Sequence, residues 1–203
     1  MTGWIGGVEY RLLPVFAGLA FFTFVPRPAS AAEISLSDLR GYSIEAEWFV
    51  NSRSISVGKS GERQRTKNDN RYVDKIYISK TVKIFHRRIG YCGSCTKPEW
   101  NFDFFRSGRS QGFKWANSTF VHTAIPSADK ERTTYVQIDR IALSQSNGSY
   151  SCSVTTSLAL QKGEKQYIKY EPSGLYRIIQ IFRSRQKSCR VFKGNVLKGE
   201  VGP

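Results

Sequence analysis

Apolar side chains recur at every second residue through much of this chain, and this period is the feature that most limits its fold. In residues 42–50, Tyr42, Ile44, Ala46, Trp48 and Val50 alternate with more polar residues. A period of two places one set of side chains on a single face of a β-strand. No stretch of twelve or more residues has the 3.6-residue apolar period of an amphipathic helix. The sequence therefore predicts an all-β protein.

Two further segments alternate clearly. Ile76, Ile78, Val82 and Ile84 share one face with only Lys80 as a break, which predicts a strand over 76–84. Residues 150–160 alternate behind Asn147-Gly148, a pair typical of a tight hairpin turn. Weaker alternation covers 112–123, 135–143, 166–170 and 175–183. We expect about seven or eight short, mainly antiparallel strands, closed as a small up-and-down barrel or, in the alternative, stacked as a sandwich.

Two stretches fall outside this pattern. Residues 33–40 are predicted as one helical turn, because Ser35 and Asp38 have the spacing of a capping box and Gly41 can end the turn. Residues 51–70 have no apolar periodicity and are predicted as a mobile loop. The sequence contains no internal repeat and no low-complexity tract, so we expect a single domain.

The first 31 residues have the features of a secretory signal. Arg11 precedes the apolar stretch 12–25, and Ala29-Ser30-Ala31 provides the small residues expected before a cleavage site. The apolar run of about 14 residues is shorter than the ~20 that a membrane-spanning helix needs. We expect a cleaved signal peptide (1–31), one basic β domain (32–203) and a periplasmic or secreted location. An uncleaved membrane anchor is the alternative.

All four cysteines follow this signal, and in an exported protein they favour disulfides over free thiols. Cys152 in a predicted strand and Cys189 near the C-terminus are expected to form a disulfide. Cys92 and Cys95 form a C-x-x-C pair, which fits a local disulfide, half of a zinc site or a redox dithiol. Zinc lacks a second ligand pair, since His86 is the only imidazole nearby, and no helix is predicted after Cys95 to activate a thiol. A local disulfide is therefore the first interpretation of the pair, and no metal site is expected.

The chain carries a formal net charge of +15, and that charge is unevenly distributed. Residues 59–88 and 162–200, the first and second basic segments, each hold ten basic and three acidic side chains, a net charge of +7. Aromatic residues alternate with these cations, which suits anionic polysaccharide, lipid headgroups or another polyanion. The plainer interpretation is that the aromatics face the core and the cations face solvent. The predicted anion-binding residues are Lys59, Arg63, Arg65, Arg87, Arg88, Arg183, Arg185 and Lys187.

Several short motifs resemble a group of small exported proteins of the rhizobial, alpha-proteobacterial type. The motifs are Asp38-Leu39-Arg40-Gly41-Tyr42-Ser43-Ile44, Ile76-Tyr77-Ile78-Ser79, Ser151-Cys152-Ser153-Val154, Ser188-Cys189-Arg190-Val191 and Gly194-Asn195-Val196. The resemblance implies export and a β-rich domain. It brings no activity and no catalytic residue, and the Cys92–Cys95 pair departs from it.

Known catalytic signatures are absent from the sequence. It has no G-x-S-x-G, H-E-x-x-H, phosphate-binding or dinucleotide-binding motif. His86 and His122 lie in strand-like segments, and Asp38, Asp74, Asp103 and Asp139 have no spacing that pairs their carboxylates. We therefore expect a non-enzymatic exported protein without a cofactor that binds an anionic envelope partner through a basic face. The alternatives are an envelope thiol–disulfide redox protein using Cys92 and Cys95, and a structural protein without a ligand.

Overall fold

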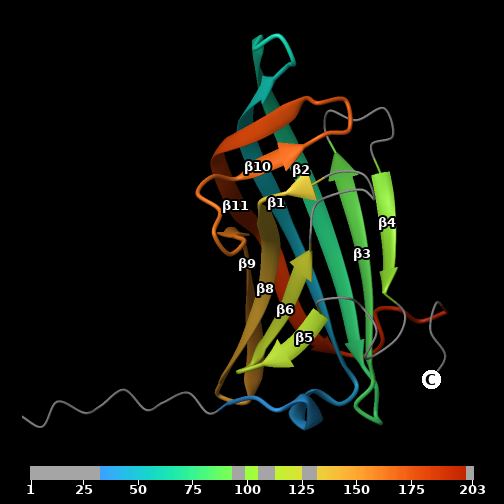
Figure 1. Ribbon diagram of the computed structural model, residues 1–203. Coiled ribbons are helices and arrows are strands. Elements are labelled where there is room, and N and C mark those ends of the chain that lie inside the picture. Colours follow the sequence, from blue (N-terminus) through green and yellow to red (C-terminus); the bar gives the residue numbers. More distant parts are fainter. Residues whose placement is uncertain (1–32, 93–98, 105–112, 125–131, 200–203) are drawn as a thin grey trace, which may run out of the picture. The chain divides into compact units, whose positions relative to one another are not determined.

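The computed structural model describes residues 33–92, 99–104, 113–124 and 132–199, with the backbone alone for 99–104 and 113. These residues form one short 3-10 helix, η1 (Leu36–Leu39), and eleven strands. The strands are β1 (Tyr42–Val57), β2 (Arg63–Ile78), β3 (Ile84–Cys92), β4 (Glu99–Phe104), β5 (Phe113–Ala116), β6 (Thr119–Ala124), β7 (Arg132–Thr133), β8 (Tyr135–Ser146), β9 (Ser149–Leu160), β10 (Ile168–Tyr170) and β11 (Tyr176–Lys193) (Figure 1). The predicted all-β class is confirmed, and the predicted signal peptide, 1–31, lies outside the described residues.

The strands form two antiparallel sheets. The larger has the order β4-β3-β2-β1-β11-β10-β7 and the smaller the order β5-β6-β8-β9. Strand β1 lies in the middle of the larger sheet, where it pairs with β2 on one side and with β11 on the other (Figure 1). The first long strand therefore pairs with the last, a contact that consecutive hairpins alone would not make. The described strands are also more numerous than the seven or eight expected.

Side chains on the facing surfaces of the two sheets form the core. On β1 the even-numbered residues point inward, and Ile44, Ala46, Trp48 and Val50 are buried. On the smaller sheet β6, β8 and β9 provide the matching inward side chains; the facing core residues are Phe120, Ile141, Leu143 and Val154. Because successive side chains of a strand point to opposite faces, the same pattern places the odd-numbered residues of β1 on the outer face of the larger sheet.

Strand β9, at the edge of the smaller sheet, is joined to β11 through side chains. Cys152 and Cys189 form the predicted disulfide, with their Cα atoms 5.5 Å apart. The backbone N–H of Val154 donates to Gln186 Oε1 over 2.7 Å, and that of Thr156 donates to Ser184 Oγ over 3.1 Å. These side chains satisfy edge amides that no neighbouring strand reaches. With a sequence separation of 37 residues, the disulfide stabilises the fold by about 4 kcal/mol in the chain-entropy model.

The local turns follow the sequence in two places. At the start of the described chain, the Ser35 backbone N–H donates to Asp38 Oδ2 over 2.9 Å, and Gly41 has a positive φ of 74°. Between β8 and β9, Asn147 and Gly148 have φ values of 50° and 75°, as a tight hairpin turn of the primed type requires. Both predictions are confirmed.

Two local predictions are wrong. Residues 51–70 are not a loop but the ends of β1 and β2, joined by a turn in which Gly58 N–H donates to Glu62 O over 2.9 Å. This part of the hairpin lacks apolar periodicity because its inward side chains are polar and its outward side chains include four cations, Arg53, Arg63, Arg65 and Lys67. Residues 76–84 are not one strand, because the chain reverses at 79–83, where Val82 has a φ of 62°.

Candidate functional site

The two basic segments lie on either side of β1. The first segment includes β2 and the second includes β11, and both strands pair with β1 along its whole length (Figure 1). Arg63, Arg65 and Lys67 occupy alternate positions of β2, and Arg183 and Arg185 occupy alternate positions of β11. All five side chains are exposed. The larger sheet thus carries two rows of cations on its outer face, one from each basic segment.

A hollow of about 640 Å³ lies between these rows and is called the cationic hollow below. Its lining residues are Phe49, Asn51, Ser52, Arg53, Lys67, Ile181, Arg183, Ser184 and Arg185. Strand register explains this grouping, since Asn51 pairs with Asp69 and Arg183, and Arg53 pairs with Lys67 and Ile181. Four cations from three adjacent strands therefore surround a floor that is formed by apolar side chains and the amide of Asn51.

Charge compensation differs along the outer face. Near the start of β1, Glu47 lies 3.2 Å from Arg71 and 3.0 Å from Lys187, and Glu45 lies 2.7 Å from Arg190. These cations are therefore neutralised locally by two acidic side chains of β1.

At the cationic hollow, by contrast, most of the positive charge is uncompensated. Asp69 pairs with Lys67 over 2.7 Å and accepts a hydrogen bond from Asn51 Nδ2 over 2.5 Å. Arg53, Arg183 and Arg185 have no ion-pair partner among the described residues. Arg185 lies over the ring of Phe49, with 5.4 Å between Cζ and the ring centroid. The hollow is therefore the part of this face that is best suited to an anion.

The other predicted anion-binding residues lie elsewhere. Lys59 is exposed in the β1–β2 turn, close to Gly174, and Lys187 is paired with Glu47. Arg87 is half-buried on β3, next to Lys75 of β2. Arg88 does not reach the surface: it is 4% exposed and lies between the two sheets. The prediction that Arg88 belongs to a basic surface is therefore wrong, because the alternation along β3 directs its side chain toward the core.

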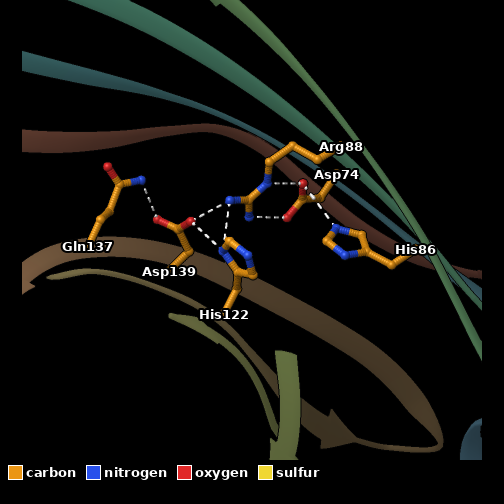
Figure 2. Close-up of polar contacts among 6 residues, drawn as sticks. All are labelled: Asp74, His86, Arg88, His122, Gln137 and Asp139. Atoms are coloured by element: carbon orange, nitrogen blue, oxygen red, sulfur yellow. Dashed lines mark hydrogen bonds and ion pairs between the residues drawn. The ribbon is translucent and has the colours of Figure 1, made fainter. Parts of the chain in front are cut away.

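Arg88 is the centre of a buried ion cluster that also contains Asp74, His86, His122 and Asp139 (Figure 2). Arg88 Nε and Nη2 donate to the two carboxylate oxygens of Asp74, both over 2.7 Å. From the other end, Arg88 Nη1 donates to Asp139 Oδ2 over 2.5 Å. Asp74 belongs to the larger sheet and Asp139 to the smaller, so one guanidinium bridges the two sheets.

The two histidines flank this bridge. His86 Nε2 lies 3.2 Å from Asp74 Oδ1, and His122 Nδ1 lies 3.1 Å from Arg88 Nη1 and 3.4 Å from Asp139 Oδ2. On the remaining side, Gln137 Nε2 donates to Asp139 Oδ1 over 3.0 Å (Figure 2). The Arg88 guanidinium also lies 5.1 Å from the ring centroid of Trp48. The cluster is thus enclosed by polar and aromatic partners.

The ionisation of the cluster follows from these contacts. Burial raises the pKa of Asp74 and of Asp139, but the charge of Arg88 outweighs it, so both pKa values lie below the ordinary value of 3.8. Burial lowers the pKa of Arg88, but the two carboxylates raise it beyond its ordinary value. Burial also lowers the pKa of His86 below 6.5, against the attraction of Asp74. Two carboxylates and one guanidinium therefore stay charged inside the core at neutral pH.

The buried ion cluster can join the sheets, but it is closed to solvent, since its five residues are 1–6% exposed. Sequence analysis did not bring Asp74 and Asp139 together. A signal existed in the phase of the strands, because Asp74 and His86 are in phase with Ile76 and Ile84, and Asp139 is in phase with Ile141. A charged residue at a core position needs a partner of opposite charge. The phase of the strand does not show which residue of the other sheet that partner is.

Of the C-x-x-C pair, the structure describes only the first residue. Cys92 ends β3, is 7% exposed and is part of a disulfide, whereas Cys95 lies outside the described residues. Within the described part of the chain, no group of His, Cys, Asp and Glu side chains could hold a metal ion. The same residues include no helix long and apolar enough to cross a membrane.

Comparisons with protein-family models, with curated proteins and with solved structures find no match to this chain. The resemblance to small exported proteins of the rhizobial type therefore stays a prediction.

Proposed function

We propose that this protein is an exported, non-enzymatic binding protein whose cationic hollow holds an anionic polysaccharide of the cell envelope. The single observation that carries the proposal is that Arg53, Arg183 and Arg185 meet in the hollow and form no ion pair among the described residues. Unpaired arginines bind carboxylate and sulfate groups through two parallel hydrogen bonds. Export makes an envelope polymer a more natural partner than an intracellular nucleic acid.

The geometry favours an extended polymer over a single small anion. Alternate residues of a strand are about 6.7 Å apart, so Arg63, Arg65 and Lys67 on β2 form a regular row of cations. Arg183 and Arg185 continue a second row across β1. A chain molecule with repeated negative groups can contact several of these cations together. Phe49 and Ile181 offer apolar contact to the sugar rings between its charged groups.

The test compares two triple variants that remove equal charge from the same sheet face. The first, Arg53→Gln with Arg183→Gln and Arg185→Gln, removes the uncompensated cations. The second, Arg71→Gln with Lys187→Gln and Arg190→Gln, removes cations that Glu45 and Glu47 neutralise. Binding to heparin, a sulfated polysaccharide, is measured as a function of salt concentration.

We expect the first variant to reduce the slope of log K against log salt by about 2–3, since each lost contact accounts for roughly 0.7–0.9. The second variant should change the slope much less. Equal losses in the two variants would show that net charge, and not the cationic hollow, governs binding. If the unmodified protein binds vesicles of anionic lipid but does not bind heparin, the ligand of the hollow is a lipid surface and not a polysaccharide.

A further inference from the structure

A second hollow lies between the two sheets and shares only Ser52 with the lining of the cationic hollow. It has a volume of about 200 Å³ and is called the polar cavity below. Its lining residues are Val50, Ser52, Ser54, Asn68, Asn70, Tyr72, Tyr135, Gln137, Leu158, Lys169, Arg177, Ile179 and Phe182. Six of them belong to the β1–β2 hairpin, which bears the cationic hollow on its outer face, and the other seven belong to β8, β9, β10 and β11. The lack of apolar periodicity in 51–70 is thereby explained by two separate polar surfaces.

We propose that the polar cavity binds one small, uncharged, multiply hydroxylated molecule with the dimensions of a single hexose. The volume is below the ~300–1,000 Å³ of sites for drug-sized ligands. A single sugar ring is therefore a better match than an oligosaccharide or a lipid chain. Arg177, one of the lining residues, has a side chain that is 38% exposed, so the lining extends to the protein surface.

The polar lining of the cavity suits a ligand that both donates and accepts hydrogen bonds. Asn70 Oδ1 is buried and has no hydrogen-bond donor within the described part of the chain, so it needs a ligand that donates. Arg177 Nε is buried and has no acceptor there, so it needs a ligand that accepts. A hydroxyl group does both. A fully ionised anion such as sulfate only accepts, and therefore leaves Asn70 unsatisfied.

Two cations line the cavity, Lys169 and Arg177, and neither is without a partner, which also favours an uncharged ligand over an anion. Arg177 Nη2 lies 2.7 Å from Glu171 Oε1, so its positive charge is already compensated. Elsewhere in the lining, Gln137 donates a hydrogen bond to Asp139 of the buried ion cluster. The lining thus differs in kind from the cationic hollow, where three arginines lack such partners.

Part of the cavity lining is apolar. Ile179 and Phe182 lie on β11 beside Ser54 and Ser52 of β1, and Leu158 lies on β9 of the smaller sheet. A pyranose ring has the matching construction, with hydroxyl groups around its edge and C–H bonds on its faces. Stacking of a sugar face on an aromatic ring removes apolar area from water without stranding a hydroxyl. One ring can therefore contact both the polar and the apolar part of the lining.

The test uses the purified protein with glucose, galactose, mannose and myo-inositol as probes, with inorganic phosphate as the contrasting anion. Binding is followed by saturation-transfer NMR and by calorimetry. We expect saturable binding of at least one of the four hydroxylated probes. Asn70→Leu removes the unsatisfied oxygen and should weaken that binding about ten-fold, as for the loss of one good hydrogen bond.

Two further variants make the result decisive. Ser52→Leu fills the cavity from β1 while leaving Asn70 in place, and should abolish binding. Lys75→Gln, on the outer face of β2, should leave binding unchanged. The proposal is overturned if no hydroxylated probe binds at up to about 50 mM, which would detect a Kd of that order. It is equally overturned if Ser52→Leu binds undiminished, or if phosphate displaces the sugar.

Discussion

At the scale of single residues, the most unusual position is that of Arg88. A charged side chain that is 4% exposed would be strongly unfavourable alone, yet Asp74 and Asp139 occupy all of its donor nitrogens. Removing one partner of such a buried group leaves uncompensated charge, whereas removing the whole group does not. Removing Arg88 alone and replacing all the charged partners together should therefore have different effects on the free energy of unfolding.

We expect Arg88→Met to lower the free energy of unfolding by about 3–5 kcal/mol, because it leaves two buried carboxylates without their cation. The triple variant Asp74→Leu, Arg88→Met and Asp139→Leu should recover most of this loss, since it replaces the charges by apolar groups. Urea unfolding followed by fluorescence measures both. A change within about 1 kcal/mol for Arg88→Met, the range of an exposed ion pair, would contradict a buried bridge.

His86 gives the fold a dependence on pH. Its pKa in the folded protein lies below 6.5, so the unfolded chain takes up a proton first as pH falls through that value. Protonation therefore favours unfolding, and stability should be greatest above pH 6.5. Towards more acid pH, Asp74 and Asp139 act in the same direction, because their folded pKa values lie below 3.8.

We expect the free energy of unfolding to decline between pH 7 and 5 by up to about 1.4 kcal/mol per pH unit for this one histidine. His86→Gln keeps an N–H donor toward Asp74 but does not titrate, so its decline should be shallower. Urea unfolding at a series of pH values gives both curves. Parallel curves would mean that His86 is not held neutral by its buried position beside Asp74, Arg88 and His122.

At the scale of strands, prediction from the sequence succeeded where one face of a strand is apolar. Residues 42–50 and 150–160 both alternate, and both are strands in the structure. Residues 51–70 were missed because the strand faces there are polar on one side and basic on the other, so hydrophobic periodicity carries no signal. The turn at 79–83 was missed because Val82 continued the apolar alternation, although it lies in the turn with a positive φ.

The junction between β9 and β11 shows a second limit, since it depends on side chains that satisfy a strand edge. We expect Gln186→Ala to expose the Val154 N–H and to speed its hydrogen exchange by at least about ten-fold, the equivalent of one lost hydrogen bond. Gln180→Ala, a matched change elsewhere on β11, should leave that amide protected. Hydrogen-exchange NMR gives the rates. Unchanged exchange at Val154 in the first variant would mean that the disulfide alone holds this edge.

At the scale of the whole molecule, the sequence predicted where basic residues cluster along the chain but not which sheet faces they occupy. The two basic segments were found by counting, but only the pairing of β2 and β11 with β1 shows that they share one sheet face. Equally, counting placed Arg88 with Arg87, although the two side chains point to opposite faces of β3. Long-range pairing determines the first outcome and is not encoded in any local motif, whereas the alternation of β3 already places Arg88 in phase with Ile84.

A net charge of +15, with three adjacent arginines that form no ion pair among the described residues, implies electrostatic repulsion within the folded protein. Screening weakens interactions between exposed charges that are farther apart than the Debye length, which falls from about 30 Å at 0.01 M salt to about 8 Å at 0.15 M. We therefore expect the Tm to rise with sodium chloride over this range. The surface pairs of Glu45 and Glu47 oppose the effect, but exposed pairs contribute little each.

The Arg53→Gln, Arg183→Gln, Arg185→Gln variant separates a local from a global origin of this repulsion. If the repulsion is concentrated at the cationic hollow, the variant should have a higher Tm at low salt and a weaker salt dependence. The Arg71→Gln, Lys187→Gln, Arg190→Gln variant loses attractive pairs and should not gain in Tm. Chloride is used because sulfate stabilises folded proteins by exclusion from their surface. Equal salt dependence in the unmodified protein and both variants would place the repulsion in the molecule as a whole.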